Sequence, residues 1–155
     1  MNASADTVIH RRVAALRAGH DPTRVARLIS GWVVLGDPQV IPGYCLLLPD
    51  PVADHLNALR AAARAQFLSD MALLGDALLA STGATRINYA IFGNAEPALH
   101  AHVFPRRTDE PAATRTAQPW ALDWNLAESY SESAHGELKR RIAVHLERSV
   151  GERSG

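Results

Sequence analysis

The chain has a single cysteine, no excess of positive or negative charge and no long apolar run, and each of these features excludes a class of protein. Cys45 is the only cysteine among 155 residues, which excludes a disulfide framework and a zinc site built from cysteines. The 16 lysines and arginines are balanced by 16 aspartates and glutamates, whereas a binder of nucleic-acid polymers or anionic membranes usually carries a basic excess. No apolar run approaches the roughly 20 residues that span a bilayer, and the N-terminus lacks the apolar core of a signal peptide. We therefore expect a cytoplasmic protein without a membrane partner.

The chain is predicted to form a single domain over residues 1–155, because 47% of its residues are hydrophobic and one core can form. The predicted helices and strands place this domain in the α+β class. Apolar residues that recur at three- and four-residue steps predict helices over residues 7–18, 58–81 and 134–150. Short β-rich runs between turn residues predict strands over 25–29, 32–35, 44–48, 86–92 and 99–104. The strands cluster as hairpins around one long crossover helix, which is typical of an antiparallel sheet.

Two histidines form the candidate site. His100 and His102 stand two residues apart in an apolar run that ends at Pro105-Arg106. On an extended strand, residues i and i+2 point to the same face, so the two imidazoles should lie side by side. Histidine is the side chain that changes charge nearest neutral pH, which suits such a pair to acid–base or nucleophilic work.

Two other interpretations of the pair stay open. A pair of histidines on a strand is, taken alone, more often structural than catalytic. A metal site would need a third or fourth ligand, for which His55, Asp109 and Glu110 are candidates if the fold brings them together. We expect no metal and no cofactor.

The pair also suits nucleophilic attack on phosphorus. A neutral imidazole, with an ordinary pKa of about 6.5, attacks phosphorus at neutral pH without a strong base. A second imidazole beside it can hydrogen-bond a phosphoryl oxygen, and such reactions depend mainly on positioning and on stabilisation of charge at these oxygens. Asn94, at the turn before the strand, and the backbone N–H groups around Gly93 are candidate donors to the same oxygens.

The segment Leu99–Arg106 (LHAHVFPR) resembles the signature of the histidine triad (HIT) superfamily. That signature reads His-φ-His-φ-His-φ-φ, where φ is apolar, and Pro-Arg often follows. Gly93-Asn94 resembles the Gly-Gln that precedes it, and residues 35–48 (LGDPQVIPGYCLLL) resemble the loop and strand that carry Asp…Pro…Pro-Gly-His. The matching motifs cover residues 32–106, and residues 107–155 form a C-terminal extension that the resemblance does not cover.

With Pro105-Arg106 as the anchor, the triad of this chain is divergent. His100 aligns with the middle histidine, which in the family attacks the α-phosphate, and His102 aligns with the third. Ala98 replaces the first histidine. A competing register makes His100 the first histidine and His102 the nucleophile, with Phe104 in the third position, and the downstream Pro-Arg argues against it.

The resemblance implies a fold and an activity. The fold is a HIT-like α+β fold whose five-stranded antiparallel sheet, with a long crossover helix and a C-terminal helix, pairs in a homodimer. The activity is hydrolysis or nucleotidyl transfer at the α-phosphate of a nucleoside phosphoramidate or dinucleoside polyphosphate, through a nucleotidyl-histidine, with a purine nucleotide as partner. The resemblance further implies that Asn88 orients the phosphate side of the site and that Asp37 holds the ribose of the nucleotide. The alternative is a non-catalytic nucleotide-binding or interaction protein, which Ala98 and Tyr44, the residue in place of the Pro-Gly-His histidine, favour.

The extension contains two tryptophans, Trp120 and Trp124. They fit a core, a dimer interface or a lid that stacks on the nucleotide, and packing in a core or interface is the commoner use of such residues.

Overall fold

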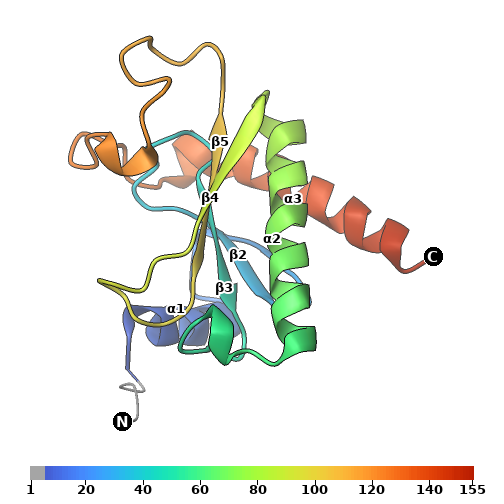
Figure 1. Ribbon diagram of the computed structural model, residues 1–155. Helices are drawn as coiled ribbons and strands as arrows, with labels where there is room; N and C mark the ends of the chain where they lie inside the picture. The colour runs from blue at the N-terminus through green and yellow to red at the C-terminus, as the bar shows by residue number, and fades with distance from the viewer. Residues whose placement is uncertain (1–5) are drawn as a thin grey trace.

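The chain folds as a five-stranded sheet with helices on its faces (Figure 1). The computed structural model describes residues 6–155, and the first five residues of the predicted domain lie outside them. In chain order the elements are α1 (Val8–Arg17), β1 (Arg24–Arg27), β2 (Gly31–Leu35), β3 (Cys45–Pro49), a short 3-10 helix (Leu56–Ala58), α2 (Ala61–Thr82), β4 (Arg86–Ala90), β5 (Ala101–Arg106), a second 3-10 helix (Pro119–Ala121) and α3 (Glu132–Arg153). None of the helices in this described part is long and apolar enough to cross a membrane.

The sheet has the strand order β1-β2-β3-β5-β4, and each neighbouring pair is antiparallel. The predicted antiparallel sheet, the long crossover helix and the C-terminal helix are therefore confirmed. β3 lies in the middle of the sheet, which explains why all five of its residues are buried. β4 lies at an edge and pairs only with β5.

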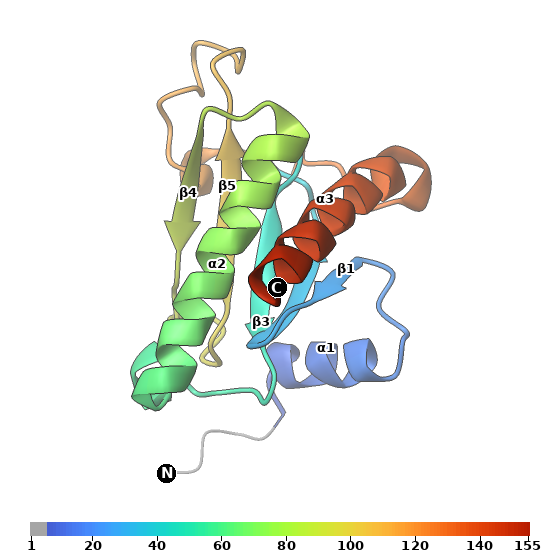
Figure 2. The same ribbon diagram turned by 90° about the vertical axis from the view of Figure 1, so that its right-hand side faces the viewer.

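The three helices agree with the prediction, with ends that differ by no more than three residues. Gly83 ends α2, because its φ of 69° lies in the left-handed region that glycine adopts without a steric penalty. α2 joins β3 to β4 and therefore crosses the sheet, and Figure 2 shows α2 and α3 crossing over the same face. That face is buried under an apolar cluster that includes Val33, Leu47 and Val103.

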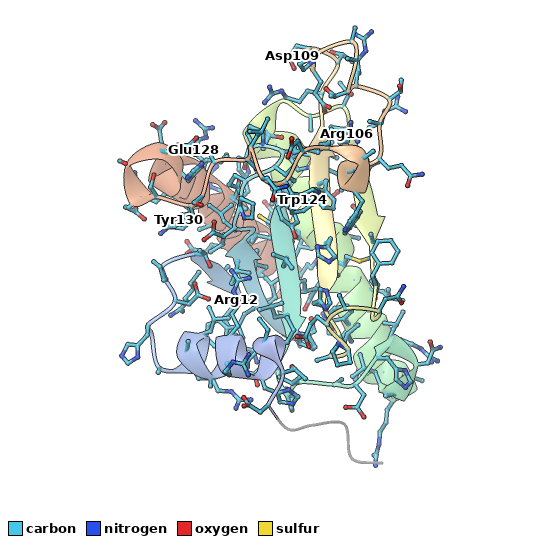
Figure 3. The ribbon with its side chains drawn as sticks, turned by 90° about the vertical axis from the view of Figure 1, so that its left-hand side faces the viewer. Arg12, Arg106, Asp109, Trp124, Glu128 and Tyr130 are labelled. Carbon is cyan, nitrogen blue, oxygen red and sulfur yellow. The ribbon has the colours of Figure 1, made fainter. Side chains whose placement is uncertain are left out.

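The opposite face of the sheet carries the candidate site. Alternate residues of β2, β3 and β5 point there, among them Trp32, Leu46 and Phe104, and they pack with α1 and with Trp124 of the extension. Figure 3 shows this face, with α1 below and the segment around Trp124 crossing above. The part of the extension that precedes α3 thus returns over the strands, a path that the sequence did not predict.

The predicted strands 86–92 and 99–104 are wrong at the ends that face each other. β4 ends at Ala90 and β5 begins at Ala101, so ten residues connect them, whereas the predicted strands leave only six, residues 93–98, for the turn that contains Gly93-Asn94. In the connection, the backbone N–H of Leu99 donates to Ala53 and that of Ala98 donates to the side chain of Glu96. These donors have partners outside the β4–β5 ladder, and the ladder starts later for that reason.

Candidate active site

The two imidazoles lie next to each other, as the sequence predicts. Their ring centroids are 4.8 Å apart and their planes are close to perpendicular. His102 belongs to β5, whereas His100 precedes the first residue of that strand. His100 is buried, and His102 is partly buried.

A backbone carbonyl fixes the protonation of His100. Its Nδ1 lies 2.8 Å from the carbonyl oxygen of Ala98. A carbonyl oxygen can only accept a hydrogen bond, so Nδ1 carries the proton and donates it. The lone pair of the neutral ring then resides on Nε2, which is the atom available for nucleophilic attack.

A phenol is the hydrogen-bond partner of His102. The hydroxyl of Tyr44 lies 2.6 Å from Nδ1 of His102. A phenol can donate or accept a hydrogen bond, and burial raises the pKa of Tyr44, so at neutral pH the phenol keeps a proton that it can donate to Nδ1. Burial lowers the pKa of His102 to about 4, and repulsion from His100 when both rings are protonated acts in the same direction. His102 is therefore neutral at pH 7, and when Tyr44 donates to Nδ1, the ring's own proton is on Nε2, where it can donate a hydrogen bond.

The position of Tyr44 depends on a glycine. A Cβ at Gly36 would lie 2.1 Å from the Tyr44 ring, so the ring can occupy its place only over a residue without a side chain. Tyr44 also stacks on Phe104 with centroids 4.3 Å apart and meets the edge of Trp124. The sequence marked Tyr44 only as a departure from a motif, and its role as the partner of His102 was missed.

The extension supplies one wall of the site. Trp120 is 45% exposed, and its ring meets the rings of His102 and Phe92 edge-on, at 5.0 and 4.7 Å between centroids. A groove of about 430 Å³ runs beside these rings, lined by Ile87, Asn88, Tyr89, Ala90, Phe92, Phe104, Gln118, Pro119 and Trp120. Trp124 instead packs against Tyr44 and Phe104. The two tryptophans thus differ, because Trp124 lies in the packed face of the sheet and Trp120 lies at the rim of the groove.

Asn88 lies in this groove, two residues from Ala90, the register partner of His102. Its side-chain oxygen accepts a hydrogen bond of 3.0 Å from the guanidinium of Arg106. A guanidinium only donates, so the amide oxygen faces Arg106 and the NH₂ group of Asn88 is left to donate elsewhere. This orientation suits the predicted phosphate-side role, which stays a prediction.

The other predicted site residues are Gly93, Asn94 and Asp37, and all three lie at exposed positions. Gly93 and Asn94 are exposed in the connection between β4 and β5, and over residues 6–155 no hydrogen bond joins Asn94 to either histidine. Asp37 is exposed, and its carboxylate accepts a 2.9 Å hydrogen bond from the backbone N–H of Tyr130. Asp37 therefore ties the loop after β2 to the extension, and its predicted role in ribose binding stays a prediction.

Within residues 6–155, no group of three or more histidine, cysteine, aspartate or glutamate side chains is placed to hold a metal ion. Two of the candidate ligands are engaged elsewhere, since Glu110 is paired with Arg106 and Asp109 with Arg107.

Comparisons with known proteins identify the fold. No protein-family model and no curated protein sequence matches the chain. Solved structures do match. A histidine triad protein of Marinobacter aquaeolei is 22% identical with a TM-score of 0.73, over 92% of this chain and 97% of that one. A histidine triad protein of Sinorhizobium meliloti is 24% identical with a TM-score of 0.70, over 84% of this chain and 93% of that one.

A third structure, a hypothetical histidine triad nucleotide-binding protein of Sulfolobus tokodaii, is 14% identical with a TM-score of 0.69, over 88% of this chain and 91% of that one. Each of these matches spans most of both chains. The chain therefore has the fold of the histidine triad proteins.

Proposed function

We propose that this protein binds a nucleotide and cleaves it at the α-phosphate by nucleophilic catalysis through His100. The observation that carries the proposal is that the two adjacent imidazoles have different partners at Nδ1, a carbonyl for His100 and a phenol for His102. The Ala98 carbonyl leaves the lone pair of neutral His100 on Nε2, and in this proposal the Tyr44 hydroxyl donates to Nδ1 of His102, so that the proton of that ring is on Nε2. One ring can attack phosphorus while the other donates to an oxygen of the same phosphate.

The bonds and protons of the proposed reaction are accounted for without a metal ion. Nε2 of His100 forms a bond to the α-phosphorus, and the bond from that phosphorus to the leaving group breaks, with its electron pair going to the leaving group. A polyphosphate leaves as an anion, whereas the amine of a phosphoramidate takes up a proton from solvent as it leaves. The ring then carries a positive charge, and its Nδ1–H donates to the Ala98 carbonyl, which stabilises that charge. Water next attacks phosphorus, the P–N bond breaks, one proton of water goes to solvent, and a nucleoside monophosphate leaves.

The groove beside His102 supports a nucleotide as the ligand. Its walls are the rings of Phe92, Phe104 and Trp120, and Asn88 contributes an amide to it. Flat apolar rings next to a few polar groups are typical of sites that bind aromatic ligands. The name of the structurally similar Sulfolobus protein includes nucleotide binding, which agrees with this class of ligand.

Mass spectrometry tests the mechanism. Brief incubation with adenosine phosphoramidate or diadenosine tetraphosphate, followed by acid-free digestion, should show a nucleotidyl adduct on His100. His100→Ala should abolish the adduct and turnover, whereas His20→Ala, at an exposed histidine before β1, should change neither. Reversible nucleotide binding without turnover over a broad panel of nucleotides would support the non-catalytic alternative instead.

A homodimer and a cytoplasmic location complete the proposal. β4 is an edge strand with unpaired backbone groups, and on neighbouring α2 the exposed residues Leu68, Ala72 and Leu79 form an apolar stripe. A second copy that pairs its own β4 and α2 would cover both. Sedimentation of the wild type as a dimer, and of Leu68→Glu as a monomer, tests the assembly; cell fractionation tests the location.

A further inference from the structure

A second hollow lies next to the groove and is rich in arginine. Its volume is about 460 Å³, and its walls come from β4, from the end of β5 and from the extension. Four arginines line it, namely Arg86, Arg106, Arg107 and Arg115, with hydroxyl and amide side chains between them. We call it the arginine pocket.

Two of the four positive charges are neutralised. Arg106, with a side chain 6% exposed, is paired with Glu110 at 2.9 Å, and Arg107 is paired with Asp109 at 2.8 Å. Arg106 also donates to the carbonyls of Thr114 and Ala117, so it holds the loop that forms the outer wall of the pocket. In Figure 3, Arg106 lies under this loop, with Asp109 at the far end.

The other two charges stay uncompensated. Arg86 forms no ion pair within residues 6–155, and the hydrogen bond of Arg115 is to the backbone carbonyl of Thr108. Two unpaired guanidiniums in one hollow, next to the hydroxyls of Thr85 and Thr116, attract phosphate oxygens, because a guanidinium binds two such oxygens at once.

The arginine pocket is continuous with the groove beside the imidazoles. Asn88 and Gln118 line both hollows. His102, Phe104 and Arg106 follow one another at two-residue steps on one face of β5, which separates the backbones of His102 and Arg106 by about 13 Å. A single amino leaving group at the α-phosphorus cannot span this distance, whereas a chain of phosphates can.

We infer that the arginine pocket binds the leaving group of the substrate, and that this leaving group is a polyphosphate. The inference rests on the proposed function for the cleavage at the α-phosphate. The bond that breaks joins the α-phosphorus to a bridging oxygen, and the released polyphosphate keeps the electron pair and stays an anion. The preferred substrate class is therefore a nucleoside or dinucleoside polyphosphate rather than a phosphoramidate.

Two substrates that share adenylate but differ in their leaving group test the inference. Arg86→Ala and Arg115→Ala should each lower kcat/KM for diadenosine tetraphosphate about tenfold, since each removes a charge-assisted contact. Both variants should leave kcat/KM for adenosine phosphoramidate within about twofold of the wild type. Arg148→Ala, at an exposed arginine of α3, is the matched control and should affect neither substrate. Equal losses on the two substrates, or no loss on either, would overturn the inference.

Calorimetry with inorganic tripolyphosphate separates this inference from the proposed function. The full-length wild type should bind tripolyphosphate, with an affinity that falls as salt is raised and that falls about tenfold in Arg86→Ala. Binding with this pattern in a protein that turns over no nucleotide would refute the cleavage and keep the anion site. Turnover of diadenosine tetraphosphate by a wild type that does not bind tripolyphosphate would keep the cleavage and refute the anion site.

Discussion

The hydroxyl of Tyr44 is the group on which the proposed role of His102 depends, and Tyr44→Phe removes only that group. The 2.6 Å hydrogen bond to Nδ1 is lost, while the ring stays over Gly36 and stacked on Phe104. The variant therefore tests the hydrogen bond without opening a cavity.

The structure gives a magnitude for this loss. Nδ1 of His102 is left partly buried without a donor, which costs about 1–3 kcal/mol. For a chain of this length, each kcal/mol lowers the melting temperature by about 2–4 °C. If the same hydrogen bond orients His102 in the transition state, kcat should fall about tenfold, which corresponds to about 1.4 kcal/mol.

The assay combines kinetics with a spectroscopic reading of the tautomer. Long-range proton–nitrogen spectra of the wild type should show His102 with its proton on Nε2, and those of Tyr44→Phe should show a mixture of both tautomers. kcat should fall while KM stays within about twofold. Tyr130→Phe is the control, since that hydroxyl bonds Glu132 and Lys139 instead. An unchanged tautomer and an unchanged kcat in Tyr44→Phe would refute the role given to the phenol.

Two further predictions concern pH and the missing histidine. The pKa of His102, about 4 in the folded chain, lies below its ordinary value of about 6.5, so the unfolded chain binds more protons between these values and stability must fall as pH falls from 6.5 to 4. The urea concentration at the midpoint of unfolding should fall less steeply with falling pH in His102→Gln than in the wild type, because the variant lacks the titrating imidazole beside His100 and Tyr44. Equal slopes in the two proteins would contradict the lowered pKa of His102. Ala98→His should destabilise the protein by about 1–3 kcal/mol without raising kcat, because Ala98 is 4% exposed in an apolar cluster. Chemical denaturation and steady-state kinetics check this, and a tenfold gain in kcat would contradict it.

The elements of the fold could be predicted because their signals are local. The period of the apolar residues marks α2 and α3, and the unbroken apolar run of β3 marks a strand that lies inside the sheet. The start of β5 could not be predicted in the same way. It depends on a hydrogen bond between Leu99 and Ala53, which are far apart in the chain, and no local pattern reveals such a partner.

The candidate site likewise combines features that local sequence patterns reveal with features that depend on residues far apart in the chain. The adjacency of His100 and His102 follows from a two-residue spacing, which is local. The contact of His102 with Tyr44 joins residues 58 positions apart, so the motif could mark Tyr44 only as a substitution. The arginine pocket depends on Arg106 and its bonds to a loop without a periodic pattern, which also lies beyond local signals.

The absence of an imidazole at position 98 has a limited chemical consequence, because the contact that holds His100 comes from the backbone. The carbonyl of residue 98 accepts the Nδ1–H of His100 at 2.8 Å, and any residue at this position presents the same carbonyl. What a side chain must supply is the donor to His102, and here Tyr44 supplies it from the neighbouring strand region. The two imidazoles therefore keep both conditions that the proposed chemistry needs, namely a free lone pair on Nε2 of His100 and, when Tyr44 donates to Nδ1, a proton on Nε2 of His102.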